Sequence, residues 1–196
     1  MTRSRAILAA TIAAAALLVA GCDSASPTTP SPEPTTIDPG TDAAPSASPS
    51  AVVVKPDRPA ELDDDGPAGA EAAAVYFLEL DDYIMKTGDT KGWEAMSGKA
   101  CGFCDARLEQ ARTIAKRGDV FEGGNTEVRV LHTYEQDAAT GIWPIDVETR
   151  EQAWHITDAD GKEIASQKAV VATSRVEVAQ TSGEWVIVGV VNDTGE

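Results

Sequence analysis

The apolar pattern that begins at residue 73 has the period of a helix. Its apolar residues lie three or four positions apart, at Ala73, Phe77, Leu80 and Ile84. This spacing places them on one face of an amphipathic helix. Three aspartates at 63–65 followed by Pro67 are typical of a helix start, and Gly88 is typical of a helix end. The pattern therefore predicts one long helix.

Two shorter helices are predicted next. Asp89 can cap the first of them, which carries Trp93 and Met96. The second has an apolar stripe at Cys104, Leu108, Ala111 and Ala115. Two cations and a glycine at 116–118 are a typical helix end, because cations and a left-handed residue suit the last turn.

Beyond residue 123 the period changes from that of a helix to that of a strand. Val128, Val130 and His132 alternate with their neighbours and are expected to share one face. Strands are predicted at about 126–136, 143–156, 163–179 and 184–191. Such long strands imply a strongly curved antiparallel sheet. The expected fold is α+β, a long N-terminal helix plus two short helices packed on a curved four-stranded antiparallel sheet.

The apolar run at residues 6–20 is a different kind of segment. It follows Arg3 and Arg5 and is shorter than the roughly 20 residues that a membrane-spanning helix needs. A basic start followed by a short apolar run is typical of an export signal. Val19-Ala20-Gly21-Cys22 at its end is typical of a lipobox. We expect cleavage of a signal peptide at 1–21 and lipid attachment to Cys22.

Composition divides the rest of the chain. Ten of the eleven prolines lie between Pro27 and Pro67, in a segment with few large apolar side chains. Such composition predicts a disordered Pro/Ser/Thr-rich tether, which together with the lipidated cysteine occupies residues 22–56. Residues 57–196 have the size and composition of one globular domain. The predicted location is the outer face of the plasma membrane, where the lipid anchors an extracellular domain in the cell envelope.

The chain is strongly acidic. Its formal net charge is -16, and loss of Arg3 and Arg5 with the signal peptide would make it -18. Nucleic acid is excluded as an expected partner, because binding it requires a basic surface. An anionic bilayer would also repel the domain, so the lipid on Cys22 is the expected means of membrane attachment.

The order of three helices followed by long strands resembles the cone-shaped fold of the nuclear transport factor 2 superfamily. A more local resemblance lies in short motifs, namely Gly69-Ala70-Glu71-Ala72, Thr87-Gly88-Asp89-Thr90, Met96-Ser97-Gly98, Cys101-Gly102-Phe103-Cys104 and Glu122-Gly123-Gly124. This succession resembles an uncharacterised family of actinobacterial lipoproteins, domain of unknown function 6318. The family shares the lipobox, the tether and the paired cysteines. The resemblance implies a compartment and no known activity.

Cys101 and Cys104 form the one motif that could carry chemistry. A structural disulfide is predicted, because the expected compartment is oxidising. A thiol-disulfide redox centre is the alternative, but a thioredoxin motif follows a buried strand, whereas here a short helix and a turn precede. A zinc site with His132 and His155 is a further alternative, although these histidines lack the spacing of a zinc finger. We expect neither metal nor cofactor.

Related cone folds often hold a cavity between the long helix and the sheet. The candidates to line it here are Tyr76, Tyr83, His132 and Tyr134. No spacing identifies an acid and base pair, so no catalytic residue is predicted. We expect a non-catalytic module that binds a small ligand or a cell-envelope protein, and a second copy of the chain is another candidate partner. The alternative is a small isomerase-like or hydratase-like enzyme that uses the cavity.

Overall fold

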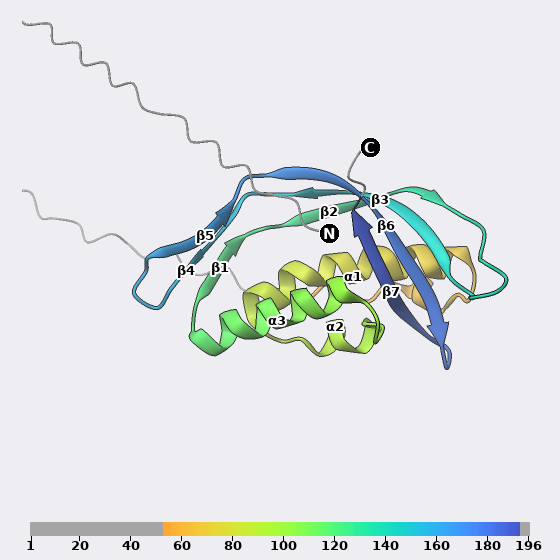
Figure 1. The fold of residues 1–196 in the computed structure, drawn as a ribbon, viewed down its shortest axis with the longest axis horizontal. Helices are drawn as coiled ribbons and strands as arrows, with labels where there is room; N and C mark the ends of the chain where they lie inside the picture. Colours follow the sequence, from red (N-terminus) through yellow and green to blue (C-terminus); the bar gives the residue numbers. More distant parts are fainter. Residues whose placement is uncertain (1–52, 193–196) are drawn as a thin grey trace, which may run out of the picture. The chain divides into compact units, whose positions relative to one another are not determined.

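The computed structural model describes residues 53–192, so the predicted signal peptide, Cys22 and tether residues up to 52 lie outside the described residues (Figure 1). The helical elements are η1 (Ala60–Asp63), α1 (Pro67–Thr87), α2 (Lys91–Met96) and α3 (Gly102–Arg117). The strands are β1 (Val120–Gly123), β2 (Thr126–Thr133), β3 (Trp143–Glu151), β4 (Trp154–Thr157), β5 (Glu163–Gln167), β6 (Val170–Thr181) and β7 (Glu184–Asn192). The domain is therefore α+β, with its helices before its strands.

The ends of α1 follow from local chemistry. Pro67 is its first residue, where the missing N–H costs no helical hydrogen bond. Gly88 stops it in the left-handed conformation, with φ of 70°, and donates its N–H to Ile84 O. The helix between them buries the face that carries Ala73, Phe77 and Leu80. Within residues 53–192, none of the helices combines the length and the hydropathy that a bilayer crossing needs.

The described strands form two antiparallel sheets, where the sequence predicted a single four-stranded one. One sheet has the order β2-β3-β6-β7 and the other the order β1-β4-β5. The strands predicted at 143–156 and 163–179 are each divided, at residues 152–153 and 168–169. At the first break, Gln152 N donates to Asn125 O, which lies outside both sheets. The prediction of one continuous curved sheet is corrected to two sheets that meet at a corner (Figure 1).

A β-bulge in β2 changes which side chains face the helices. Val130 pairs with Val147 and His132 pairs with Asp146, so Leu131 is the extra residue. Beyond the bulge, Thr133 takes the inner face, where its Oγ1 donates to Glu71 Oε1 of α1 at 2.6 Å. His132 is exposed. The prediction that His132 shares a face with Val128 and Val130 is therefore wrong, because one inserted residue reverses a period of two.

The main core lies between the helices and the inner face of the four-stranded sheet. The sheet contributes Ile145, Val147, Val176, Val178 and Ile187 to it, all fully buried. Trp93 of α2 is also fully buried and stacks on Phe77 of α1 with ring centroids 3.9 Å apart. Its Nε1 donates to Cys104 O of α3 at 3.0 Å. This one indole therefore joins all three helices.

A disulfide joins Cys101 and Cys104 at the start of α3. The two residues are 1% and 0% exposed, so a partner thiol has little access to the bond. Cys104 N donates to Cys101 Sγ at 3.2 Å, which caps the first turn of the helix. On the chain-entropy model a loop this short contributes only about 2 kcal/mol. The bond therefore fixes the entry into α3 more than it stabilises the whole domain.

Candidate ligand-binding cleft

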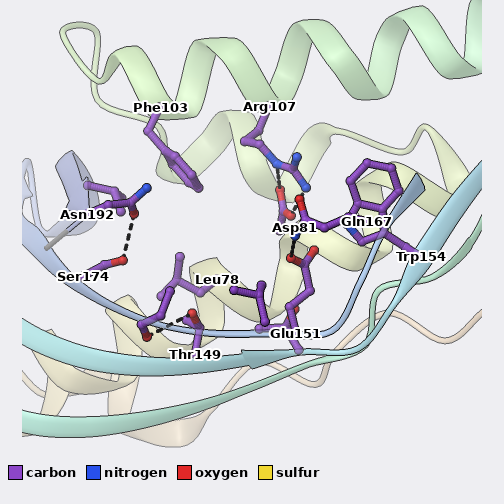
Figure 2. A pocket seen from close by; sticks show the side chains of 14 residues that line it. Leu78, Asp81, Phe103, Arg107, Thr149, Glu151, Trp154, Gln167, Ser174 and Asn192 are labelled. Carbon is purple, nitrogen blue, oxygen red and sulfur yellow. Dashed lines mark hydrogen bonds and ion pairs between the residues drawn. The ribbon is translucent and has the colours of Figure 1, made fainter. Parts of the chain in front are cut away.

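A cleft of about 320 Å³ opens between α1, α3 and the inner face of the four-stranded sheet, beside the corner where the sheets meet (Figure 2). This volume is near the lower end of the roughly 300–1,000 Å³ that is typical of small-molecule sites. The helices contribute Leu78, Asp81, Phe103 and Arg107. The strands contribute Thr126, Thr149, Glu151, Trp154, Gln167, Val170, Ala172, Ser174, Val190 and Asn192.

Strand register decides which sheet residues reach the cleft. Thr149 pairs with Ala172 and Glu151 pairs with Val170, and alternate residues of a strand share one face. Ser174 Oγ donates to Asn192 Oδ1 at 2.9 Å, which joins β6 to β7 on the same face. The sheet therefore presents both apolar and polar side chains to the cleft, from strands that are hydrogen-bonded to one another.

An ion pair between α1 and α3 forms the opposite wall. Arg107 Nε donates to Asp81 Oδ1 at 2.7 Å, and Nη2 donates to the other oxygen of the same carboxylate. Arg107 Nη1 donates to Gln110 Oε1 at 2.9 Å, so each guanidinium nitrogen has an acceptor. Burial acts to lower the pKa of Arg107, but the hydrogen bond and charge of Asp81 outweigh it and leave the pKa raised. Three of the five N–H donors of Arg107 are therefore used, and its charge is paired with that of Asp81.

Glu151 differs from Asp81 because it forms no ion pair with any residue between 53 and 192. Its Oε2 accepts a hydrogen bond from Gln167 Nε2 at 2.8 Å. Burial raises the pKa of Glu151, and the nearby charge of Arg107 offsets this only in part. The folded domain therefore keeps a partly desolvated carboxylate at some expense to its own stability. Carboxylates of this kind gather at functional sites.

Two aromatic side chains, Phe103 and Trp154, supply the larger apolar surfaces of the cleft. Trp154 stacks with Phe121 at a centroid distance of 5.4 Å. Phe103 packs at a tilt against Trp93, with centroids 6.2 Å apart. Because each ring is supported by a buried aromatic neighbour, both walls are held in place before any ligand arrives.

The four residues that the sequence predicted to line a cavity do not line this cleft. Among the described residues, its lining includes none of them. Tyr76 lines a smaller recess of about 180 Å³ together with Leu62 and Met96. Tyr83 Oη donates to Asp89 Oδ2 at 3.1 Å, near the end of α1. The two tyrosines of α1 thus lie at other surfaces of the same helix.

His132 and Tyr134 lie on the outer face of the sheet because of the bulge in β2. There, Tyr134 Oη donates to Asp146 Oδ2 at 2.9 Å and Arg175 Nε donates to Asp146 Oδ1 at 2.8 Å. Arg175 also lies over the Tyr134 ring, 4.6 Å from its centroid. The hydrogen bond from Arg175 lowers the pKa of Asp146. This is a cross-strand polar network that ties β2, β3 and β6 together.

The zinc alternative finds no support in the arrangement of its four residues. Cys101 and Cys104 are bonded to each other. His132 lies on β2, in one sheet, whereas His155 lies on β4, in the other, where its Nε2 is 3.2 Å from Glu122 Oε2. In the part of the chain that the structure describes, no three His, Cys, Asp or Glu side chains are grouped so as to hold a metal ion.

Sequence reasoning missed the residues that build the cleft. Asp81, Arg107 and Glu151 come from α1, α3 and β3, and no local spacing relates them. The only signal was the interruption of the apolar pattern of the first helix by carboxylates, Asp81 among them.

Comparison with known proteins gives a family and a fold. The sequence pattern described as "Family of unknown function (DUF6318)" matches residues 39–191. The intermembrane space region of chloroplast protein ARC6 is 13% identical; the match covers 65% of this chain and 98% of that one, with a TM-score of 0.51. An uncharacterised protein with a cystatin-like fold from Caulobacter vibrioides is 12% identical over 65% and 92% of the two chains, with a TM-score of 0.36. No curated protein matches the sequence. At 13% sequence identity, the similarity to the ARC6 region shows a shared fold alone.

Proposed function

Because the chain belongs to DUF6318, a family of unknown function, we propose a role from its own geometry. The domain is a non-catalytic binding module of the cell envelope, anchored at the outer face of the membrane by lipid on Cys22. Its fold is a cone of the nuclear transport factor 2 type, and its site is the cleft at the corner of the two sheets. The observation that carries the proposal is the cleft itself, which combines fixed apolar walls with a few polar groups.

The cleft proposal is tested by NMR titration of small aromatic fragments into the full chain carrying Cys22→Ser, exported to an oxidising compartment. Fragments are expected to shift the signals of Arg107, Glu151 and the Trp154 indole. The control is Ala172→Trp, which places a large side chain in the cleft and is expected to abolish these shifts while the other signals stay dispersed. Fragments that leave all three signals unmoved, or that shift them equally in Ala172→Trp, would contradict the proposal.

A change at Cys22 tests the anchor. In a bacterium that processes lipoproteins, the wild-type chain is expected to incorporate labelled palmitate and to sediment with membranes, because burial of acyl chains holds it there. Cys22→Ser is expected to lose the label and to migrate as the longer precursor, because lipid attachment to Cys22 precedes cleavage of the signal peptide. Ser24→Ala, two residues away, is the control and should behave as wild type. Membrane-bound, labelled Cys22→Ser protein would rule out this anchor.

A second candidate function is an isomerase-like or hydratase-like enzyme that uses the same cleft. The raised pKa of Glu151 favours it, because a general base works best with a pKa near the operating pH. A proton-transfer mechanism also needs an acid or an electrophile to stabilise the developing charge. The nearest group of that kind, Arg107, has its charge paired with Asp81 and three of its five donors committed to Asp81 and Gln110. This is why we propose binding in preference to catalysis.

A further inference from the structure

The charges of the cleft do not cancel. Of the described residues that line it, three are charged: Asp81, Arg107 and Glu151. Asp81 and Arg107 neutralise each other through two hydrogen bonds, which leaves one negative charge, on Glu151. Figure 2 shows the Asp81–Arg107 pair and the Glu151–Gln167 contact as separate groups within the cleft.

We propose that the cleft binds a small organic cation with an apolar body. Its ammonium group lies against Glu151, and its apolar part occupies the space between Phe103 and Trp154. The inference rests on the proposed function, since it names the class of ligand for the same site. It commits to a small molecule because a cleft of about 320 Å³ suits a small ligand better than a protein segment.

Three features of the site favour a cation over an anion or a neutral molecule. A partly buried carboxylate attracts a cation more strongly than an exposed one does, because less water screens it. The face of an indole such as Trp154 attracts cations through its quadrupole. An anion would meet repulsion from Glu151 and would have to compete with Asp81 for Arg107, whose charge is already paired. The acidic chain, with a net charge of -16, also draws cations toward the surface.

An inorganic cation fits the site less well. Calcium takes six to eight oxygen ligands and magnesium six, and protein carboxylates are usually among them. Here the second carboxylate, Asp81, is bound to Arg107, and within residues 53–192 no group of three or more potential ligands lies together. Much of the remaining lining is apolar, from Leu78, Val170, Ala172 and Val190, which would leave an ion poorly coordinated. An ammonium group with an apolar body uses both kinds of surface.

The test compares three probes of nearly equal size and different charge, which are benzylammonium, benzyl alcohol and benzoate. Each is titrated by NMR into the full chain carrying Cys22→Ser, at neutral pH and fixed salt. Benzylammonium is expected to bind roughly tenfold more tightly than benzyl alcohol, and benzoate most weakly. In Glu151→Gln the preference for the amine over the alcohol is expected to disappear.

Glu148→Gln is the control, because it removes an equal charge from the opposite, outer face of β3, where Glu148 pairs with Arg129 and Arg150. It should keep the preference for benzylammonium. Equal binding of the amine and the alcohol by wild type, or the same loss of preference in Glu148→Gln, would overturn the inference and leave the cleft as a neutral site. If none of the three probes shifted the cleft signals, the proposed binding function would fail with it.

Discussion

Replacement of Trp93 by alanine is expected to lower the free energy of unfolding by about 4 kcal/mol. The indole is fully buried, and its removal would leave a large cavity where the three helices meet. The change would also remove the stacking on Phe77 and leave Cys104 O without its donor. Urea denaturation of the full chain carrying Cys22→Ser, followed by circular dichroism, measures the loss.

Trp93→Phe separates the two contributions of this side chain. A phenyl ring keeps most of the apolar volume and the contact with Phe77 but cannot donate to Cys104 O. We therefore expect a smaller loss, about 2 kcal/mol, from the smaller ring and the missing hydrogen bond. Equal stability of Trp93→Ala and wild type would show that α2 does not pack as described.

Asp81→Asn is expected to lower the free energy of unfolding by about 3 kcal/mol, because it leaves Arg107 charged and without its counterion. The two side chains are only 20% and 17% exposed, so water can replace the lost carboxylate only in part. Asparagine can still accept one hydrogen bond, which keeps the expected loss below that of a complete truncation. The same denaturation experiment measures it.

A double-mutant cycle with Arg107→Met tests the origin of that effect. The double variant removes both members of the pair, so neither is left as an unpaired charge, and stability is expected to recover by about 1–2 kcal/mol relative to Asp81→Asn alone. Additive losses in the cycle would mean that the two side chains do not interact in solution. The cleft would then lack its helical wall.

The helices were predictable because their signals are local. The apolar period from Ala73 to Ile84, Pro67 at the start and the glycines at 88 and 118 all act within a few residues of the backbone they shape. The four predicted strands matched real ones in position, but β1 was missed and two of the four were wrongly predicted to be continuous. Whether a long alternating segment stays in one sheet depends on the strands with which it pairs. The hydrogen bond from Gln152 to Asn125 cannot be predicted from the alternation of apolar and polar residues in either segment.

The bulge at Leu131 had the largest consequence for the site. It moved His132 and Tyr134 to the outer face, so two of the expected cavity residues became part of a surface network with Asp146 and Arg175. Glycines at 123 and 124, with φ of 84° and 74°, did mark the corner beside the cleft. A Cβ on Gly123 would lie 2.2 Å from Ala153 O, so the close approach of β1 to the β3–β4 connection depends on that glycine.

The cleft itself was beyond sequence reasoning, since its three charged residues lie on elements far apart in the chain. Aromatic residue type suggested Tyr76 and Tyr83, whereas the structure uses Phe103 and Trp154 as walls. Either pair of aromatic residues could form an apolar wall. Which pair does so is decided by the packing of α1 against α3 and the sheet. Residues that meet only in the folded structure have no fixed spacing in the sequence by which they could be recognised.

Cation binding in the cleft is tested most directly by a crystal structure of the chain, produced in an oxidising compartment and soaked with benzylammonium. We expect electron density for the ring between Phe103 and Trp154, with the ammonium nitrogen within hydrogen-bond distance of Glu151. A ligand seated on the outer face of the sheet, or a cleft closed by its own side chains, would contradict it.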